Sequence, residues 1–224
     1  TQGEGCLIME RIICLVIGYV FGLFQTGYIY GRLNHIDIRE YGSGNAGTTN
    51  VMRTLGRKAG FITYFGDALK AVLCIILIHF LFGVKHPDIE FLLVLYAGLG
   101  VILGHNFPFY LGFRGGKGIA TTSGVILSLL PYNWMLAVLA FSTFMIVTFV
   151  SRYVSLGSLV MVTGFFIEFV VFGQLGMLNV LPEHLAEAYI IAFIITALAF
   201  IRHRANIKRL MTGTERKIGH KNKA

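Results

Sequence analysis

Seven apolar segments, joined by short polar connections, constrain this 224-residue chain more than any other feature. About twenty helical residues cross a hydrocarbon core of ~30 Å, so all but one of the segments are long enough to span a membrane directly or with slight extension. Charged residues make up only 13% of the chain, well below the share in a soluble domain. The sequence therefore predicts an all-α polytopic integral membrane protein with seven transmembrane helices. The segments lie at roughly 12–30, 60–82, 91–107, 119–130, 134–150, 156–172 and 188–201.

The segment 119–130 is the exception in length, because its helix would rise only about 18 Å. Two explanations stay open: the helix begins near Gly116, or the segment is partly buried in protein as a broken or re-entrant element. No internal repeat is visible, so we expect a single membrane-embedded domain over residues 1–224. Residues 1–8 lack an initiator methionine, and we expect them to be disordered or foreign to the natural chain. Residues 211–224 form a basic tail.

The basic residues predict the orientation. Most of the 19 Lys and Arg residues lie in the regions 31–59, 104–118, 151–155 and 202–224, whereas the opposite connections offer only Lys85. Because Lys and Arg concentrate on the cytoplasmic side, we expect the N-terminus outside and the C-terminus in the cytoplasm. This distribution also accounts for the net charge of +8 without any nucleic-acid partner.

Few polar or reactive groups interrupt the apolar segments. Cys6, Cys14 and Cys74 are odd in number and match no metal-site spacing, so we interpret them as small hydrophobic residues. Asp67 and Lys70 are three positions apart on one segment. Unpaired charges are costly in a membrane, so we expect these two to pair and to face the bundle.

Two glycine-rich stretches, 42–47 and 114–118, fall on the predicted cytoplasmic side. Glycine lets the backbone turn sharply and present N–H groups to an anion, and a nearby basic side chain completes such a site. Neither stretch has the spacing of a phosphate-binding loop of soluble nucleotide enzymes. The simpler alternative for the first stretch is a solvated turn that caps the next helix through Ser43 or Asn50.

The second stretch leads directly into an apolar segment, whose helix N-terminus would favour an anion beside Lys117. The alternative is membrane anchoring by Lys117, with the glycines serving close helix packing. His105, at the end of the preceding segment, is better explained as a structural hydrogen-bonding residue than as a base. In the tail, His203 and Asn206 are spaced to share one helix face. They indicate an active site only in combination with the two loops.

Three motifs together carry a resemblance: 43–53 (SGNAGTTNVMR), 104–108 with 113–121 (GHNFP and FRGGKGIAT), and 202–207 with 213–215 (RHRANI and GTE). In order and spacing they closely resemble the bacterial acyl-phosphate-dependent glycerol-3-phosphate acyltransferases. The resemblance implies an inner-membrane enzyme that moves a fatty acyl group from acyl phosphate to glycerol 3-phosphate, giving 1-acylglycerol 3-phosphate (lysophosphatidic acid) and phosphate.

The family's functional positions fall on residues of the expected type. By this resemblance the catalytic residues are Ser43, Asn45, Arg53, Lys117, His203 and Asn206. We expect the neighbouring residues of the three motifs, with two from the connection after residue 150, to bind substrate. They are Gly44, Gly47, Thr49, Asn50, His105, Gly115, Gly116, Gly118, Arg152 and Ser155.

The chemistry expected of such a site needs no metal and no cofactor. Acyl phosphate carries a good leaving group, so direct attack by the glycerol hydroxyl is expected, with either His203 or a substrate phosphate oxygen accepting the proton. The partners are the two substrates and membrane lipid, and we expect a monomer in the bacterial cytoplasmic membrane with its active site at the cytoplasmic face. The alternative class, an organic-phosphate transporter, should place its polar site at the midplane and show repeat symmetry.

Overall fold

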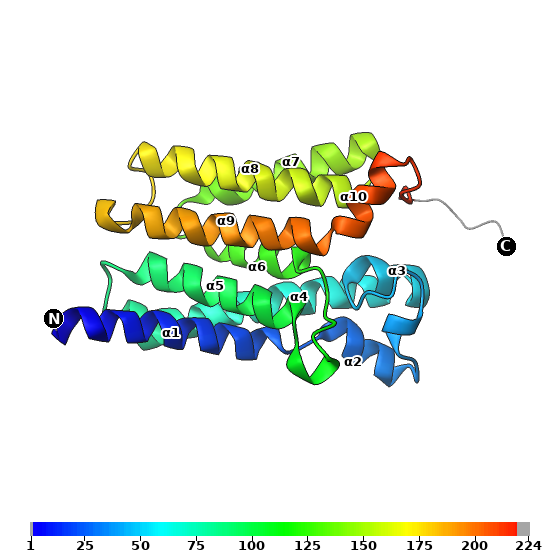
Figure 1. Cartoon of the computed structure of the whole chain (residues 1–224), viewed down its shortest axis with the longest axis horizontal. Coiled ribbons are helices and arrows are strands. Elements are labelled where there is room, and N and C mark those ends of the chain that lie inside the picture. Colours follow the sequence, from blue (N-terminus) through cyan, green and yellow to red (C-terminus); the bar gives the residue numbers. More distant parts are fainter. Residues whose placement is uncertain (1, 219–224) are drawn as a thin grey trace.

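The structure is a computed structural model that describes residues 2–218, with side chains from residue 8 onward. The long helices lie side by side as one bundle, and the short helices α2, α3 and α10 gather at the end opposite the N-terminus (Figure 1). The α-helices are α1 (Gln2–Gly22), α2 (Thr26–Leu33), α3 (Thr48–Leu55), α4 (Arg57–Ile78), α5 (Glu90–Asn106), α6 (Ile119–Ser128), α7 (Trp134–Ser151), α8 (Val154–Gln174), α9 (Leu185–Arg202) and α10 (Arg204–Met211). Short turns of helix complete the fold: η1 (Ile38–Glu40), the π-helical turn η2 (His79–Gly83), η3 (Phe109–Leu111) and η4 (Pro182–His184).

Helix α5 forms the centre of the bundle, and it is buried along most of its length. Its contact with α1 is close, because a Cβ on Gly18 or Gly22 would overlap backbone atoms of α5, and one on Gly100 or Gly104 would overlap backbone atoms of α1. Small residues four apart allow such backbone approach between membrane helices. The outer helices expose large apolar side chains, as lipid-facing helices do.

Within residues 2–218, six helices or helix pairs are long and apolar enough to cross a membrane, and α6 is shorter, with 10 residues. The prediction of membrane-length segments is therefore confirmed except at α6. This helix begins at Ile119, so the explanation that it starts near Gly116 is wrong. Residues 121–126 are buried against neighbouring helices, in agreement with the alternative of a segment partly buried in protein.

The first apolar segment is not one uninterrupted helix. The chain leaves α1 after Gly22 and enters α2 at Thr26, where the sequence predicted continuous helix over 12–30. The buried Gln25 side chain holds this break, because its Nε2 donates to Gly22 O and to the backbone oxygens of Gly104 and His105 on α5. The break redirects α2 toward the first glycine-rich stretch.

The chain ends differ from expectation in one respect. Residues 2–8 continue helix α1, so the backbone is helical where disorder was expected. After α10, residues 212–218 fold back, and the Ile218 N–H donates to Arg152 O at 2.8 Å. Residues 219–224 of the basic tail, with Lys221 and Lys223, lie outside the described residues.

Cys14 and Cys74 are buried free thiols, as predicted, while the Cys6 side chain lies outside the described side chains.

Candidate active site

The first glycine-rich stretch is held in shape by Asn50 on α3. Its Oδ1 accepts from the Ser43 N–H at 2.8 Å, and its Nδ2 donates to Ile38 O and Tyr41 O. Asn50 is 2% exposed, and both hydrogens of its amide nitrogen are used by these bonds. Asn50 also lines the cavity described below, so its role in substrate binding stays a prediction beside this structural one. Neither Ser43 nor Asn50 caps α3, whose N-cap is Gly47.

Asn45 connects the two glycine-rich stretches. Its Oδ1 accepts from the Gly47 N–H at 2.9 Å, and its Nδ2 donates to Gly115 O at 3.4 Å. The hydroxyl of Ser43 has no hydrogen-bond partner in the part of the chain that the structure describes. These bonds fix the backbone around Ser43 and leave its hydroxyl available.

Arg202 holds the second stretch from the opposite side. Its guanidinium donates to Gly115 O at 2.8 Å and to Gly116 O at 3.0 and 3.2 Å, and it lies over the Phe107 ring. Because carbonyl and N–H point in opposite directions across a peptide plane, the amide N–H groups that follow these carbonyls point away from Arg202. Gly118 then adopts φ +86 and forms the N-cap of α6, as the sequence predicted for a loop that leads into a helix.

The tail motif meets the second stretch through Lys117 and Asn206. Lys117 Nζ donates to Asn206 Oδ1 at 2.5 Å, and Asn206 Nδ2 donates to Glu215 Oε1 at 2.8 Å. His203 lies at the junction between α9 and α10, where its Nδ1 is 2.7 Å from Ala199 O. A carbonyl oxygen can only accept, so Nδ1 carries the proton and Nε2 has a free lone pair.

Glu215 belongs to the cavity wall, although the sequence predicted no role for it. Its carboxylate accepts hydrogen bonds from Ser155 Oγ, Asn206 Nδ2 and Arg209 Nε at 2.6–2.9 Å. Its side chain is 6% exposed. The only signal in the sequence was its place in the third motif, as the single acidic residue of a strongly basic tail.

The electrostatics of this region are those of an anion site. Burial lowers the pKa of Lys117 to about 8, and the positive charges of Arg209 and Arg53 add to the shift. Burial and the neighbouring Arg216 and Arg209 also lower the pKa of Arg53. Each shift reflects cations held close together, an arrangement that a bound anion would stabilise.

A cavity of about 380 Å³ brings the three motifs together. All six residues predicted to be catalytic line it, and so do six of those predicted to bind substrate: Gly47, Thr49, Asn50, His105, Gly118 and Ser155. Arg209, Glu215 and Arg216 extend its polar wall. Its other end is apolar and lies between α4, α6 and α7. That end is formed by Phe61, Tyr64, Ile119, Phe141, Phe144 and Met145.

Four residues predicted to bind substrate do not line the cavity: Gly44, Gly115, Gly116 and Arg152. Gly44 is an exposed turn residue at φ +69. Gly115 and Gly116 are buried, and a Cβ on either would overlap atoms of His105. Arg152 exposes its side chain at the α7–α8 corner and contributes only its carbonyl to the tail. In this structure they shape the loops and dock the tail, and their role in substrate binding stays a prediction.

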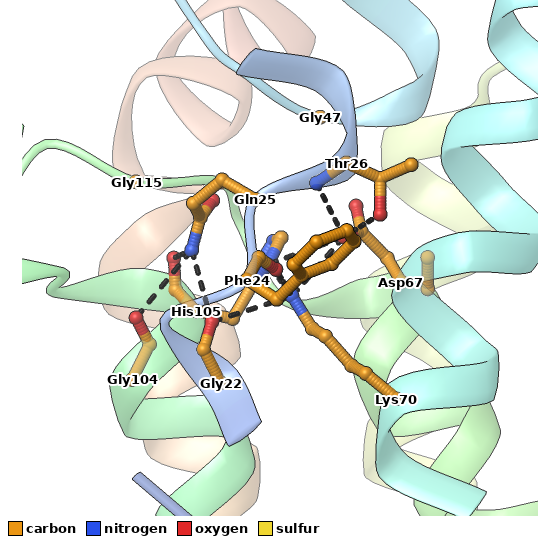
Figure 2. Close-up of polar contacts among 12 residues, drawn as sticks. Gly22, Phe24, Gln25, Thr26, Gly47, Asp67, Lys70, Gly104, His105 and Gly115 are labelled. Carbon is orange, nitrogen blue, oxygen red and sulfur yellow. Dashed lines mark hydrogen bonds and ion pairs between the residues drawn. The ribbon is translucent and has the colours of Figure 1, made fainter. Parts of the chain in front are cut away.

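A buried charged group lies immediately behind the cavity. Lys70 Nζ is 3.1 Å from Asp67 Oδ1 and 2.8 Å from His105 Nδ1 (Figure 2). The prediction that Asp67 and Lys70 pair and face the bundle is confirmed, since they are 1% and 5% exposed. His105 makes a structural hydrogen bond, as expected, and also lines the cavity together with Asp67.

Comparison with known proteins identifies the family. Residues 12–213 match the sequence profile of the family described as "Glycerol-3-phosphate acyltransferase". The chain belongs to this glycerol-3-phosphate acyltransferase family. A glycerol-3-phosphate acyltransferase of Clostridioides difficile (strain 630) is 41% identical over 216 residues, which cover 96% of this chain and 98% of the relative. One of Halalkalibacterium halodurans is 42% identical over 217 residues, which cover 95% and 98%.

Solved structures of this acyltransferase family show the same fold. The crystal structure of PlsY (YgiH), an integral membrane glycerol 3-phosphate acyltransferase, in its glycerol 3-phosphate form aligns with a TM-score of 0.78 and 33% identity, over 93% of this chain and 96% of that chain. Its lysophosphatidic acid form aligns with a TM-score of 0.76 and 32% identity, over 93% and 95%. The protein is thus a multi-pass membrane glycerol-3-phosphate acyltransferase that produces lysophosphatidic acid.

Proposed function

We propose that this acyltransferase moves a fatty acyl group from acyl phosphate to glycerol 3-phosphate within the cavity of about 380 Å³. One observation carries the proposal: a single cavity joins a basic polar wall to an apolar arm between lipid-facing helices. Two phosphate-bearing substrates need the first part, and an acyl chain needs the second. The relatives' names supply the acceptor, glycerol 3-phosphate.

The basic wall is suited to both phosphate groups. Arg53 has no hydrogen-bond partner among the described residues, so its planar fork is available for bidentate phosphate binding. Lys117 supplies a second cation beside the N-terminus of α6, whose N–H groups and dipole favour negative charge. Arg209 and Arg216 extend the positive field at the cavity rim.

The apolar arm is suited to the acyl chain. Phe61 on α4 and Met145 on α7 line it and are 55% and 62% exposed on the lipid-facing surface. A chain lying between them would leave the site directly into the bilayer, so neither an acyl donor nor a lysophospholipid product would need to cross water. Phe144 and Ile119 form the inner part of the arm, next to the polar wall.

The reaction proceeds by direct transfer. The glycerol hydroxyl oxygen attacks the acyl carbonyl carbon, the carbon–oxygen bond to phosphate breaks, and phosphate leaves with the bonding electrons. The Nε2 lone pair of His203 accepts the hydroxyl proton and passes it to the departing phosphate. Lys117 and Arg53 stabilise the charge that grows on the phosphate. Holding both substrates in one cavity supplies the remaining acceleration through orientation.

Ser43 and Asn45 bind substrate rather than form a covalent intermediate. The Ser43 hydroxyl lies in the cavity wall without a base bonded to it in the described structure, whereas an activated nucleophile has one within hydrogen-bond reach. Asn206 orients Lys117 through its Oδ1. These assignments make Ser43 a phosphate ligand and Asn206 a partner of the catalytic cation.

The chain crosses the bilayer seven times, with α6 as the short crossing and the N-terminus outside. Lys and Arg concentrate in every second connection, which supports this orientation. In this orientation the cavity would lie at the cytoplasmic face of a bacterial cytoplasmic membrane. We expect a monomer to be active, because all three motifs of one chain line the same cavity.

An assay with purified enzyme tests the donor. We expect glycerol 3-phosphate to be acylated by acyl phosphate, with release of one phosphate per product and no need for a divalent metal or nicotinamide. Arg53→Met should abolish most of this activity, whereas Lys85→Met, which changes an exposed lysine that does not line the cavity, in the connection between η2 and α5, should not. Strong activity with acyl-CoA while acyl phosphate stays inert would overturn the proposal.

A further inference from the structure

The ammonium group of Lys70 lies directly behind the cavity, and the acyl transfer proposed above does not use it. Its Nζ is 2.6 Å from Phe24 O, 2.8 Å from His105 Nδ1, 3.1 Å from Asp67 Oδ1 and 3.4 Å from Gly22 O (Figure 2). Groups this deeply buried are stable only when their hydrogen bonds are satisfied.

The partners of Lys70 determine which nitrogen of His105 carries the proton. The three hydrogens of the Lys70 ammonium match its three shortest contacts, to Phe24 O, His105 Nδ1 and Asp67 Oδ1, and the Phe24 and Asp67 oxygens can only accept. A charged ammonium has donors and no acceptor, and it therefore donates to His105 as well. Nδ1 of His105 is then unprotonated, and the neutral ring carries its proton on Nε2.

The Nε2–H edge of His105 faces the second glycine-rich stretch. A Cβ on Gly116 would overlap Nε2, so the ring edge lies against the backbone next to Lys117. His105 also lines the cavity. Because Nδ1 is occupied by Lys70, Nε2–H is the group through which the ring can act on a bound molecule.

Asp67 fixes the position of Lys70. Its Oδ1 accepts from Thr26 Oγ1 at 3.0 Å and from the Thr26 N–H at 3.4 Å, at the start of α2. The carboxylate is 1% exposed and compensates the buried positive charge. The break between α1 and α2 is therefore tied to the same group that sets the His105 tautomer.

We propose that Lys70 is a positioning residue for the acyl transfer: it holds His105 in the Nε2–H tautomer, so that His105 donates a hydrogen bond to an anionic oxygen of a substrate in the cavity. The proposal rests on the proposed function for the identity of that substrate. His105 then contrasts with His203, whose Nδ1 is protonated and whose Nε2 accepts. The site holds two neutral histidines of opposite tautomer, one as donor and one as acceptor.

The tautomer can be tested without an activity assay, by 15N NMR spectroscopy of enzyme that carries 15N-labelled histidine. In the wild-type enzyme the His105 ring should show a protonated Nε2 and an unprotonated Nδ1, with its signals assigned by their loss in His105→Phe. A protonated Nδ1 on His105 would overturn the proposal, whichever acyl donor the enzyme uses. Failure of the acyl-phosphate assay would leave this measurement unaffected, so the two hypotheses fail separately.

Kinetics test whether Lys70 acts through His105. Lys70→Met alone leaves Asp67 buried without its cation, so the decisive variant is Asp67→Asn with Lys70→Met, which removes both charges. We expect this double variant to fold and to elute from a size-exclusion column in detergent as the wild type does. Its kcat/KM should fall about 10- to 100-fold, the effect of losing one hydrogen bond to a charged group. His105→Phe should give a similar loss.

The two changes should not add. Combining His105→Phe with the Asp67→Asn, Lys70→Met pair should cost little more than either alone, because both remove the same donor. Lys58→Met, at an exposed lysine at the start of the same helix, is the matched control and should retain wild-type kcat/KM. Additive losses, or a fully active charge-free variant, would show that Lys70 serves folding alone and would overturn the proposal.

Discussion

The Nδ1 atom of His203 lies 2.7 Å from the carbonyl oxygen of Ala199, one helical turn earlier in the chain. This bond fixes the imidazole with its Nε2 lone pair free. Burial and the charge of Lys117 lower the pKa of His203 to about 4, so the ring is neutral at pH 7 and able to accept a proton. Anionic substrates beside Lys117 would offset part of this lowering and make the ring a better base.

His203→Ala should therefore lower kcat about 10²- to 10³-fold, the usual effect of losing one group that acts in the transition state. Membrane insertion and the yield of folded protein should be unchanged. Steady-state rates with saturating substrates give the result, and Lys208→Ala, at an exposed position on α10, is the control. If His203→Ala kept the wild-type kcat, a substrate phosphate oxygen would be the proton acceptor instead.

The lowered pKa of Lys117 predicts an alkaline limit to catalysis. The amine loses its charge as the pH rises through about 8, and the neutral form attracts phosphate less strongly. We expect kcat/KM for glycerol 3-phosphate to fall above pH 8, where the substrate phosphate is already a dianion. Lys117→Arg keeps its charge far above this range, so any activity that remains in it should show no such fall. An identical alkaline limb in the wild type and Lys117→Arg would exclude Lys117 as its origin.

Arg202 offers a separate test of the second glycine-rich stretch. Its guanidinium holds the carbonyls of Gly115 and Gly116, and lysine cannot bridge both with one ammonium group. Arg202→Lys should raise the KM for a phosphate-bearing substrate about tenfold, with a smaller effect on kcat, because the N–H groups of the loop lose their fixed direction. Arg204→Lys, two residues on and exposed, should behave as the wild type. A change confined to kcat would contradict this account.

Glu215 should contribute to stability as well as to activity. Loss of its bonds to Ser155, Asn206 and Arg209 in Glu215→Ala should cost about 1.5–3 kcal/mol, the range for hydrogen bonds to charged groups. Thermal unfolding in detergent measures this loss, with Glu183→Ala, at an exposed position in η4, as control. Unchanged unfolding of Glu215→Ala would mean that the tail docks without this carboxylate.

The stability of the fold should also depend on pH through the Glu215 carboxylate. Burial would raise the pKa of Glu215, but the bonds from Arg209, Asn206 and Ser155 outweigh it, and the net pKa is lowered. A carboxylate with a lowered folded-state pKa stabilises the fold above its ordinary pKa, and this stabilisation is lost as the pH falls through the folded-state value. The acid-side loss of stability should therefore be smaller in Glu215→Ala than in the wild type.

The apolar segments and the three motifs could be read from the sequence because their signals are local. Hydropathy located most of the helices to within a few residues, although α1 begins well before the predicted segment 12–30. The glycine-rich loops with Lys117, His203 and Asn206 do meet at one cavity. The break after Gly22 could not be predicted, since no proline or local breaker causes it. Gln25 and Lys70 hold it through bonds to distant helices, which local sequence does not encode.

The same limit applies to the structural roles of the site residues. Asn50 and Arg152 have side chains typical of phosphate sites, and only the fold shows that the Asn50 amide closes a turn and that the exposed Arg152 does not line the cavity. Glu215 was overlooked for the opposite reason, because an acidic residue does not suggest anion binding. Its value lies in the partners that it orients, and these come from α8 and α10.

Orientation in the membrane can be tested with single cysteines in a background where Cys6, Cys14 and Cys74 are replaced by alanine. Lys58→Cys and Arg114→Cys probe the end of the bundle that carries the cavity, and both positions are exposed. Gly42 is unsuitable, because a Cβ there would overlap Asn50 Oδ1 and its φ is +61.

An impermeant thiol reagent should fail to label Lys58→Cys and Arg114→Cys in intact cells and should label both after the membrane is permeabilised. Lys85→Cys, at an exposed position in the connection between η2 and α5, should react from outside. This expectation follows from the excess of Lys and Arg at the cavity end, because connections rich in these residues stay on the cytoplasmic side. Labelling of Lys58→Cys in intact cells, with Lys85→Cys protected, would reverse the orientation and place the cavity at the outer face, away from cytoplasmic acyl phosphate.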